Sequence, residues 1–339
     1  MILVTGATGH LGNVLVRKLA RMGMKMRALV LPGDDVSPIA DLGIEVVYGD
    51  VRNEDDVANA MKGVELVFHL AAVISITPWK KRLVYEVNVK GSENVLKAVK
   101  RSSVRMVYVS SVHAFAEPEA GAVIDENTPI DPDMTTGSYG KSKAIATLKM
   151  IEAAKQGADV TIICPTGIIG PYDYKGSEMG RVFTKFLRGK LKVFIDGSFD
   201  FVDVRDVAEG LIKAAEHGKP GDIYILGNRS ITIRKLMQLL EEASGVPAPH
   251  VYLPTYLAWL VSGINTAFTV LRLEEPVFTP YAIHTLTRNY AFSHEKAKRE
   301  LGYNPRPLEE TVKDTIEWFR LQLAFKNLNT LRATSLRNR

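Results

Sequence analysis

Cysteine is nearly absent from this sequence. The single cysteine, Cys164, excludes a framework of disulfide bonds and any zinc cluster built on several cysteines. The chain opens on Met1-Ile2-Leu3-Val4 and shows neither the basic segment nor the cleavage site of a secretory signal. We therefore expect a cytoplasmic protein.

Long uninterrupted apolar runs are also missing. The longest apolar region, residues 251–273, is broken by Pro254, Gly263 and Asn265, whereas a membrane-spanning helix needs about 20 nearly continuous apolar residues. We therefore expect no membrane span. The composition, with 46% hydrophobic and 24% charged residues, is that of a globular protein. It excludes disordered, collagen-like and low-complexity chains.

Acidic residues are absent from the C-terminal end. No aspartate or glutamate follows Glu317, whereas basic residues continue to Arg339, and the whole chain carries a formal net charge of +5. Such a tail could contact an anionic membrane or a nucleic acid, but a solvated, frayed terminus is more common. We favour the frayed terminus and expect neither nucleic-acid nor metal binding.

Short apolar runs alternate with helical patterns through the first half of the chain. The runs are apolar throughout, as in strands that are buried on both faces; they cover residues 2–4, 26–31, 45–48, 64–72, 106–110 and 160–164. Helical spacing separates them, at 10–22, 57–62, 84–100 and 142–156. This repetition predicts an α/β fold with a doubly wound parallel sheet.

The chain changes character after Pro165, where glycines and prolines become frequent. We expect residues 1–165 to form the sheet domain, with returning segments around 200–228 that include a strand at 222–226. Residues 166–320 then form mainly a smaller, discontinuous lid, and residues 321–339 a basic tail. A ligand is expected between the two parts, at the carboxyl ends of the strands.

A glycine-rich loop joins the first strand to the first helix. Glycines let a pyrophosphate approach the free N–H groups at a helix N-terminus. A plain tight turn is the alternative, but three spaced glycines between a strand and a helix favour dinucleotide binding. The expected contacts are Gly6, Thr8, Gly9, His10, Leu11 and Gly12.

Two later strand ends suit the same ligand. Asp50 and Val51 follow the run 45–48, where a carboxylate can accept the adenine amino group, although Asp50 could also be a solvated turn residue. The small residues that end the run 64–72 leave room for a ribose; they are Leu70, Ala71 and Ala72.

A tyrosine and a lysine four residues apart lie in a predicted helix. Their spacing puts Tyr139 and Lys143 on one helix face, and a neighbouring ammonium lowers the pKa of a phenol. Tyr139 then becomes a usable general acid–base. Ser111 ends a predicted strand, where its hydroxyl can meet the phenol. An ordinary helix pair is the alternative for Tyr139 and Lys143 alone, but Ser111 and the glycine loop favour catalysis.

The ordered motifs resemble the extended short-chain dehydrogenase/reductase superfamily, of the NAD-dependent epimerase/dehydratase type. They are Gly6-x-x-Gly9-x-x-Gly12, Asp50-Val51, Leu70-Ala71-Ala72, Asn88-Val-x-Gly91, Ser110-Ser111, Tyr139-x-x-x-Lys143 and Pro165-Thr166-x-x-x-Gly170-Pro171, with further matches up to about residue 320. The resemblance implies a Rossmann-type domain, a bound nicotinamide cofactor and a homodimer.

The resemblance also implies roles for individual residues. Tyr139 would be the acid–base, Lys143 would hold the ribose and tune Tyr139, and Ser111 would orient the reacting oxygen. Asn88 would be a backbone brace or a member of a proton relay. Further cofactor contacts are implied at Pro165, Gly167 and Ile168.

Three positions point to a branch of the superfamily. Val112-His113 stands where nucleotide-sugar dehydratases carry Asp-Glu, Gly167 replaces their usual asparagine, and Phe199 replaces the arginine that grips a diphosphate. The stretches Pro165–Pro171 and Phe199–Asp203 instead look like the dihydroflavonol 4-reductase and 3β-hydroxysteroid dehydrogenase branch. An apolar stretch from Tyr252 to Phe278 agrees with an apolar substrate, although lid core is the commoner explanation. Candidate pocket residues are His113, Thr166, Tyr172 and Phe199.

We therefore expect an NAD(P)-dependent oxidoreductase that interconverts a secondary alcohol and a ketone on a small, mostly apolar substrate. The second possibility is a nucleotide-sugar 4-epimerase, and the third is a catalytically silent, cofactor-binding regulatory protein. NAD is slightly favoured over NADP, because Leu31 stands at the end of the second strand, no arginine is there for a 2′-phosphate, and Asp34 and Asp35 follow.

Overall fold

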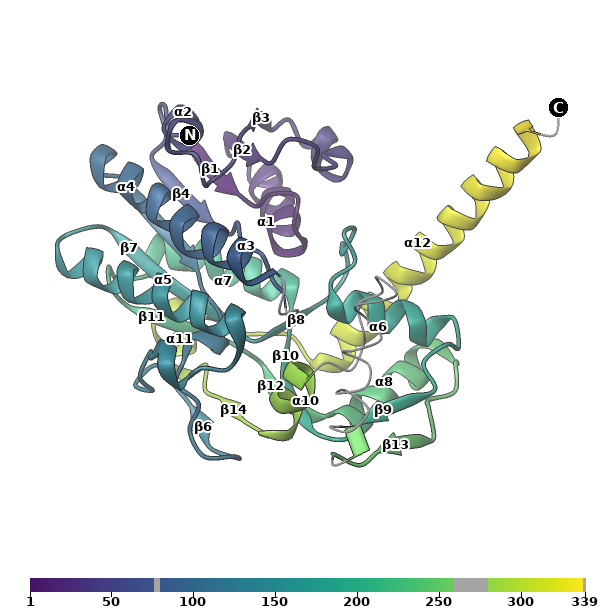
Figure 1. The fold of residues 1–339 in the computed structure, drawn as a ribbon. Coiled ribbons are helices and arrows are strands. Elements are labelled where there is room, and N and C mark those ends of the chain that lie inside the picture. The colour runs from purple at the N-terminus through teal and green to yellow at the C-terminus, as the bar shows by residue number, and fades with distance from the viewer. Residues whose placement is uncertain (76–79, 256, 259–279, 338–339) are drawn as a thin grey trace.

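A seven-stranded parallel sheet forms the body of the protein in the computed structural model (Figure 1), which describes residues 1–75, 80–255, 257–258 and 280–337. The strand order is β11-β7-β5-β4-β1-β2-β3, and every neighbouring pair is parallel. The strands are β1 (Ile2–Thr5), β2 (Met26–Val30), β3 (Glu45–Tyr48), β4 (Leu66–His69), β5 (Arg105–Val109), β7 (Val160–Pro165) and β11 (Ile223–Leu226). The predicted doubly wound parallel sheet is confirmed.

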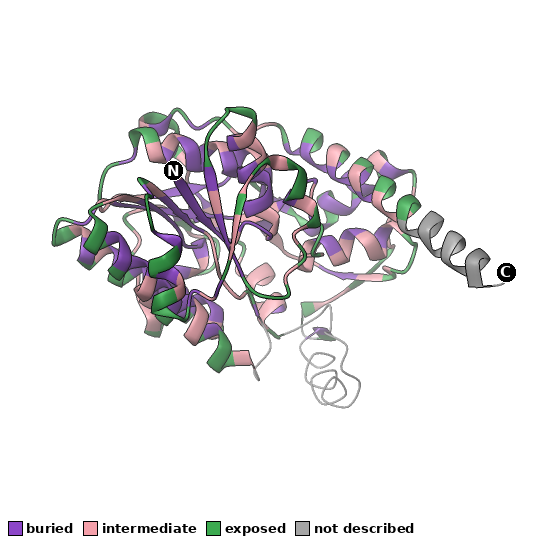
Figure 2. Ribbon diagram, turned by 90° about the horizontal axis from the view of Figure 1, so that it is seen from above, coloured by how far each residue is buried: buried purple, intermediate pink, exposed green. Residues whose placement is uncertain are grey.

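Helices cover both faces of this sheet, and each face buries its own apolar cluster (Figure 2). One face carries α1 (His10–Arg21), α7 (Val204–His217) and α11 (Glu295–Leu301). The other carries α2 (Glu54–Ala60), α4 (Ser92–Ser102) and α5 (Gly137–Lys155). The strands between them are buried on both sides, which explains their continuously apolar sequences.

The predicted helix over 84–100 is instead built from three segments. These are α3 (Lys81–Tyr85), a π-helical turn η3 (Glu86–Gly91) and α4. The extra residue of a π-turn disturbs the helical ladder and is often found at functional sites. Here it carries Asn88, which is buried.

The second half of the chain adds small sheets and helices beside the carboxyl ends of the main strands. A three-stranded sheet joins β8 (Gly167–Ile169), β10 (Ser198–Asp203) and β12 (Arg229–Thr232). Two further pairs are β9 (Val193–Ile195) with β13 (Val251–Leu253), and β6 (Val123–Ile124) with β14 (Ala291–Phe292). The helices here are α6 (Glu178–Leu187), α8 (Ile233–Ser244), α10 (Pro280–Thr287) and α12 (Leu308–Arg337). Most of the apolar stretch from Tyr252 to Phe278 lies outside the described residues.

Helix α12 packs its first half against α6 and α8, and its second half extends away from the body of the protein (Figure 1). Leu321 and Phe325 are exposed where the helix leaves the body. Within the described ranges, no helix combines the length and apolar character that a bilayer span requires.

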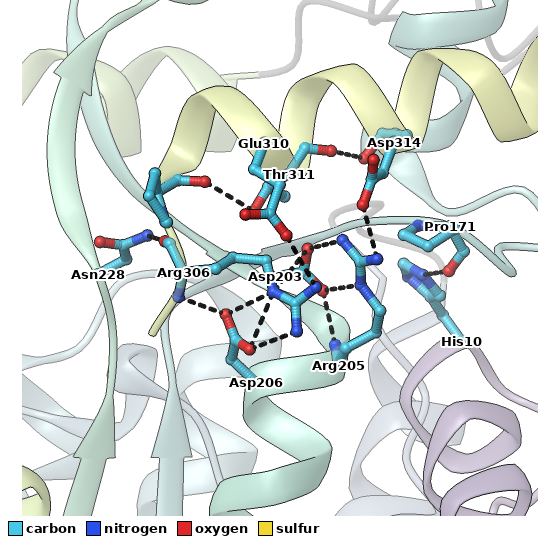
Figure 3. A network of polar contacts seen from close by, with 12 residues as sticks. His10, Pro171, Asp203, Arg205, Asp206, Asn228, Arg306, Glu310, Thr311 and Asp314 are labelled. Atoms are coloured by element: carbon cyan, nitrogen blue, oxygen red, sulfur yellow. Dashed lines mark hydrogen bonds and ion pairs between the residues drawn. The ribbon is translucent and has the colours of Figure 1, made fainter. Parts of the chain in front are cut away.

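A network of ion pairs fastens the C-terminal segment to the sheet (Figure 3). Arg306, which precedes α12, pairs with Asp206 at 2.8 Å and lies 3.6 Å from Asp203. Arg205 binds Asp203 at 2.6 Å and Asp314 of α12 at 2.7 Å. Because the Asp203 side chain has no exposed surface, its charge depends on these two guanidinium groups.

We predict that Arg306→Met lowers the free energy of unfolding by about 3 kcal/mol, because breaking a buried ion pair leaves an uncompensated carboxylate. Chemical denaturation measures this change. Arg299→Met is the matched control: Arg299 pairs with Glu300 on an exposed surface, so its loss should change stability by less than about 1 kcal/mol. Equal losses in the two variants would contradict the role given to Arg306.

Candidate active site

The glycine-rich loop forms a cradle that only glycine permits. Gly6 has a φ of +75°, and a Cβ at Gly12 would lie 2.0 Å from the Gly6 carbonyl oxygen. Gly9 is the N-cap of α1, and no side chain caps this helix end. The first N–H groups of α1 therefore have no capping side chain, which is the arrangement that binds a pyrophosphate at a helix N-terminus.

A buried hydrogen-bond chain holds the floor of this cradle. Ala71 donates its N–H to the Thr5 hydroxyl at 3.1 Å, Thr5 contacts His69 Nδ1 at 2.7 Å, and His69 Nε2 contacts the Ser92 hydroxyl at 2.9 Å. Burial lowers the pKa of His69 to about 3, so the ring is neutral. These hydrogen bonds hold Leu70 and Ala71 close to Gly6. A Cβ added at Gly6 would lie only 2.8 Å from the Ala71 backbone nitrogen.

The predicted adenine contact, Asp50, is engaged with Arg52. One carboxylate oxygen accepts the Arg52 N–H at 2.9 Å, and the other accepts its guanidinium at 2.6 Å. This hydrogen bonding lowers the pKa of Asp50. The next residue, Val51, packs beneath Gly91. Each Asp50 oxygen has two lone pairs, so the carboxylate can accept a further hydrogen bond besides those from Arg52. The contact between Asp50 and the adenine amino group therefore stays a prediction.

Asp34, in the loop that follows β2, pairs beside the glycine-rich loop with a cation that the sequence analysis did not expect. Leu31 is exposed, but Asp34 turns back and accepts a hydrogen bond from Thr8 at 2.8 Å. Lys175 also binds Asp34, at 2.8 Å. The sequence analysis missed Lys175, because no local pattern connects residues 141 positions apart.

Ser111 and Tyr139 meet at the carboxyl end of β5. Tyr139 lies in the first turn of α5 and is buried, and the Ser111 side chain is close enough to lower its pKa. Lys143, one turn later, is also buried and donates from Nζ to the Val109 carbonyl at 2.8 Å. The structure therefore brings the three predicted catalytic residues together.

The pKa of Tyr139 lies above its ordinary value, whereas the sequence analysis expected Lys143 to lower it. Burial raises the pKa of Tyr139 to about 12, against a smaller lowering by Ser111. Burial also lowers the pKa of Lys143 to about 8. The reason is that the low-dielectric site disfavours both charged forms, and the ammonium is directed at the Val109 carbonyl instead.

Asn88 has the geometry of a backbone brace. Its Oδ1 accepts the Val73 N–H at 2.8 Å, and its Nδ2 donates to the Val73 carbonyl at 3.0 Å and to Ser142 at 2.9 Å. Ser142 in turn donates to the Tyr139 carbonyl at 2.7 Å. Asn88 thus ties the segment that follows β4 to α5.

An aromatic wall stands beside the Tyr139 ring. His113 lies edge-on to Tyr139 with 6.2 Å between ring centroids, stacks on Phe199 at 5.8 Å and contacts Tyr281 at 5.6 Å. Burial lowers the pKa of His113 to about 4, so the imidazole is neutral at ordinary pH. The sequence analysis missed Tyr281, which only the tertiary structure brings beside the catalytic helix.

Two features allow Tyr281 to pack in the aromatic wall: the missing side chain at Gly137 and hydrogen bonds that hold α10. Gly137 opens α5 at a φ of +78°, and a Cβ there would lie 2.9 Å from the Tyr281 ring. On the same lid helix, His284 contacts Glu117 at 2.6 Å, and Glu117 accepts the Thr136 N–H at 3.0 Å. These contacts fasten α10 to the start of the catalytic helix.

The residues around Gly167 build the base of the wall. A Cβ at Gly167 would lie 2.9 Å from the Phe199 ring and from the Asp200 carbonyl. Ile168 pairs with Val202, and Pro165 pairs with Leu226. The Thr166 hydroxyl donates to Asp200 at 2.7 Å, so it belongs to this framework.

Tyr172 lies in a different contact set. Its ring packs against Arg17, Tyr174 and Trp318, and its carbonyl accepts from Asn13 at 2.8 Å. None of its described ring contacts is with His113 or Phe199. The geometry places Tyr172 beside the first helix, so a pocket role for it gains no support.

The fold and site define a Rossmann-type dinucleotide-dependent enzyme class, and comparison with known proteins gives the family. The sequence profile of the NAD dependent epimerase/dehydratase family matches residues 2–227. The chain belongs to this family, which confirms the expectation of a nicotinamide-dependent member of the extended short-chain dehydrogenase/reductases.

Individual relatives extend this similarity over nearly the whole chain. The sterol demethylase protein B of Methylococcus capsulatus is 34% identical, over 94% of this chain and 98% of its own. A Synechocystis protein with the provisional name dihydroflavonol 4-reductase is 31% identical, over 93% of each chain. The crystal structure of gox2253 superposes with a TM-score of 0.83 at 33% identity, and covers 95% of this chain and 98% of its own.

We predict that Lys143→Met stabilises the protein while it weakens cofactor binding. At pH 7 the buried ammonium opposes folding, so its removal should raise the free energy of unfolding by about 1–3 kcal/mol. The gain should shrink as pH rises from about 8 toward 10.5, because the folded wild type then sheds the proton. Denaturation at several pH values measures it.

Lys141→Met is the matched control for this prediction. Lys141 lies on the exposed side of the same helix, so its loss should leave stability nearly unchanged at every pH. A Lys143→Met protein that is less stable than Lys141→Met at pH 7 would contradict the burial penalty.

Proposed function

We propose that this protein is an NAD(P)-dependent oxidoreductase that interconverts a ketone and a secondary alcohol on a small, mostly apolar substrate. The observation that carries the proposal is the meeting of Ser111, Tyr139 and Lys143 beside a wall formed by His113, Phe199 and Tyr281. The triad supports carbonyl chemistry, and the wall supports an apolar ring or chain.

The proposed proton transfer follows from the burial of the site. A phenol whose pKa is about 12 stays protonated at neutral pH, so Tyr139 donates its proton to the substrate oxygen as a ketone is reduced. Ser111 hydrogen-bonds the same oxygen and orients it. When bound, the nicotinamide supplies hydride for reduction or accepts it for oxidation.

Lys143 has a separate role in this proposal. Its ammonium is already desolvated and held by a single described acceptor, the Val109 carbonyl. A ribose hydroxyl of the cofactor supplies a second acceptor, which favours the charged form. The charged lysine then stabilises the phenolate that remains after Tyr139 gives up its proton.

The substrate class follows from the base of the wall. The Phe199 ring occupies the space that any side chain at Gly167 would need, so this wall presents an aromatic face where a diphosphate would require a cation. The names of the Methylococcus and Synechocystis relatives refer to a sterol and a flavonoid, which supports an apolar ring substrate. We further infer a homodimer, by analogy with the family, and keep the cytoplasmic location as a prediction from the sequence.

Tyr139→Phe tests the acid–base role. It should lower turnover by about 10²–10⁴-fold, because the ring stays and only the proton donor is lost. NADH affinity should change by less than about threefold. Turnover of a panel of apolar ketones, followed at the nicotinamide absorbance, measures the first effect and calorimetry the second.

The control for this variant is Tyr48→Phe, which removes a hydroxyl from an exposed tyrosine at the end of β3 and should leave turnover unchanged. Ser111→Ala should lower turnover with little change in NADH affinity. If Tyr139→Phe kept turnover within twofold of wild type, the assigned chemistry would be wrong.

Nucleotide-sugar binding tests the substrate class. With the cofactor site saturated by NAD, UDP-glucose should bind no more tightly than roughly 1 mM, near −4 kcal/mol, because none of the described wall residues, His113, Phe199 and Tyr281, is a cation at neutral pH. An apolar cyclic ketone should bind more tightly through its buried area. A micromolar Kd for UDP-glucose by calorimetry would instead favour the epimerase alternative.

A further inference from the structure

A strap formed by residues 171–177, between β8 and α6, lies over the first helix. The Pro171 carbonyl contacts His10 Nε2 at 2.9 Å (Figure 3), and the Tyr172 carbonyl accepts from Asn13 at 2.8 Å. Tyr172 adopts a φ of +71°, a conformation that a tyrosine rarely takes. These contacts hold the strap against the helix whose N-terminus forms the cofactor cradle.

The strap delivers one cation to that cradle. Lys175 donates to the Thr8 hydroxyl at 3.0 Å and to Asp34 Oδ2 at 2.8 Å, while Thr8 donates to the same oxygen at 2.8 Å. The three side chains therefore close a triangle between the glycine-rich loop, the end of β2 and the strap. Arg17 packs over Tyr172 and Tyr174 and supports the strap from the helix side.

The position of this triangle identifies the ligand group it faces. In a doubly wound sheet the pyrophosphate lies at the N-terminus of the first helix, and the adenosine ribose lies at the end of the second strand. Thr8 belongs to the first of these places and Asp34 to the second. The triangle therefore lies where a bound cofactor would place the 2′-hydroxyl of NAD or the 2′-phosphate of NADP.

We propose that the ion pair between Asp34 and Lys175 sets the choice between NAD and NADP in this protein. Asp34 accepts the ribose hydroxyls of NAD, occupies the Lys175 ammonium and repels a 2′-phosphate. Lys175 is the latent phosphate-binding cation. The inference rests on the proposed cofactor cradle and is independent of the proposed chemistry at Tyr139.

The charges at the triangle support NAD in the wild-type protein. Asp34 and Asp35 outnumber Lys175, and Lys175 lowers the pKa of Asp34 against the opposing effect of its partial burial, so Asp34 is ionised at neutral pH. A 2′-phosphate carries close to two negative charges at pH 7. It would meet one carboxylate already paired with the local cation and a second carboxylate nearby.

Asp34→Asn reverses this balance while it keeps a hydrogen-bonding side chain for the ribose. The substitution removes the repelling charge and frees the Lys175 ammonium for the 2′-phosphate. The dissociation constants of NADH and NADPH, measured by calorimetry on the full chain, report the effect. NADPH should bind at least about tenfold more tightly to Asp34→Asn than to wild type, and NADH affinity should change less.

Three further variants separate the ion pair from general charge. Asp35→Asn removes the same charge next to Asp34, but Asp35 hydrogen-bonds the Ser37 N–H and leaves Lys175 paired. Its ratio of NADPH to NADH affinity should stay within about threefold of wild type. Lys175→Met should weaken NADPH further. The double variant Asp34→Asn/Lys175→Met should lose most of the NADPH gain.

The proposal is overturned by any of three results. One is a wild-type protein that binds NADPH more tightly than NADH. Another is an equal affinity ratio in Asp34→Asn and Asp35→Asn. The third is a double variant that retains the full gain, which would leave Lys175 without a role. Because the readout is binding, an inactive Tyr139 would not affect it, whereas failure of both cofactors to bind the wild type would overturn the cradle itself.

Discussion

The close backbone approach around Gly6 is the constraint on which the active site depends. A Cβ at Gly12 would lie 2.0 Å from the Gly6 carbonyl oxygen, and a Cβ at Gly6 would lie 2.8 Å from the Ala71 backbone nitrogen. This contact brings the ends of β1 and β4 and the start of α1 within one tight volume. A neutral, buried His69 holds the arrangement from below through Thr5. No side chain caps the N–H groups at the start of α1.

Helix α5 carries two buried ionisable side chains whose burial lowers the stability of the folded protein. Tyr139 and Lys143 are both buried, and burial shifts the pKa of each toward its neutral form. A site designed only for stability would place apolar residues there. On the proposed function, a desolvated ammonium one helical turn from a phenol would aid catalysis, because electrostatic interactions are stronger where water is excluded. The packed sheet and the ion pairs around Asp203 supply the stability that this arrangement requires.

The second half of the chain specialises the cofactor platform in two places. Phe199 packs over Gly167 and turns one side of the site into an aromatic surface, completed by Tyr281 from α10. The strap carries Lys175 to the adenosine end of the cradle. On the proposed function, the aromatic surface would contact the substrate and Lys175 the adenosine end of the cofactor, so the substrate class and the cofactor preference could vary independently.

Local sequence patterns determined the sheet, the glycine loop and the spacing of Tyr139 and Lys143, because strand burial and helical periodicity depend on neighbours in the chain. The tertiary structure alone decided three further features. It brought Lys175 to Asp34 and Tyr281 to His113, since contacts between distant segments leave no local signal. It broke the helix before α4 at a π-turn that positions Asn88. It also decided the sign of the pKa shift of Tyr139, because desolvation depends on everything packed around a group rather than on its neighbour in sequence.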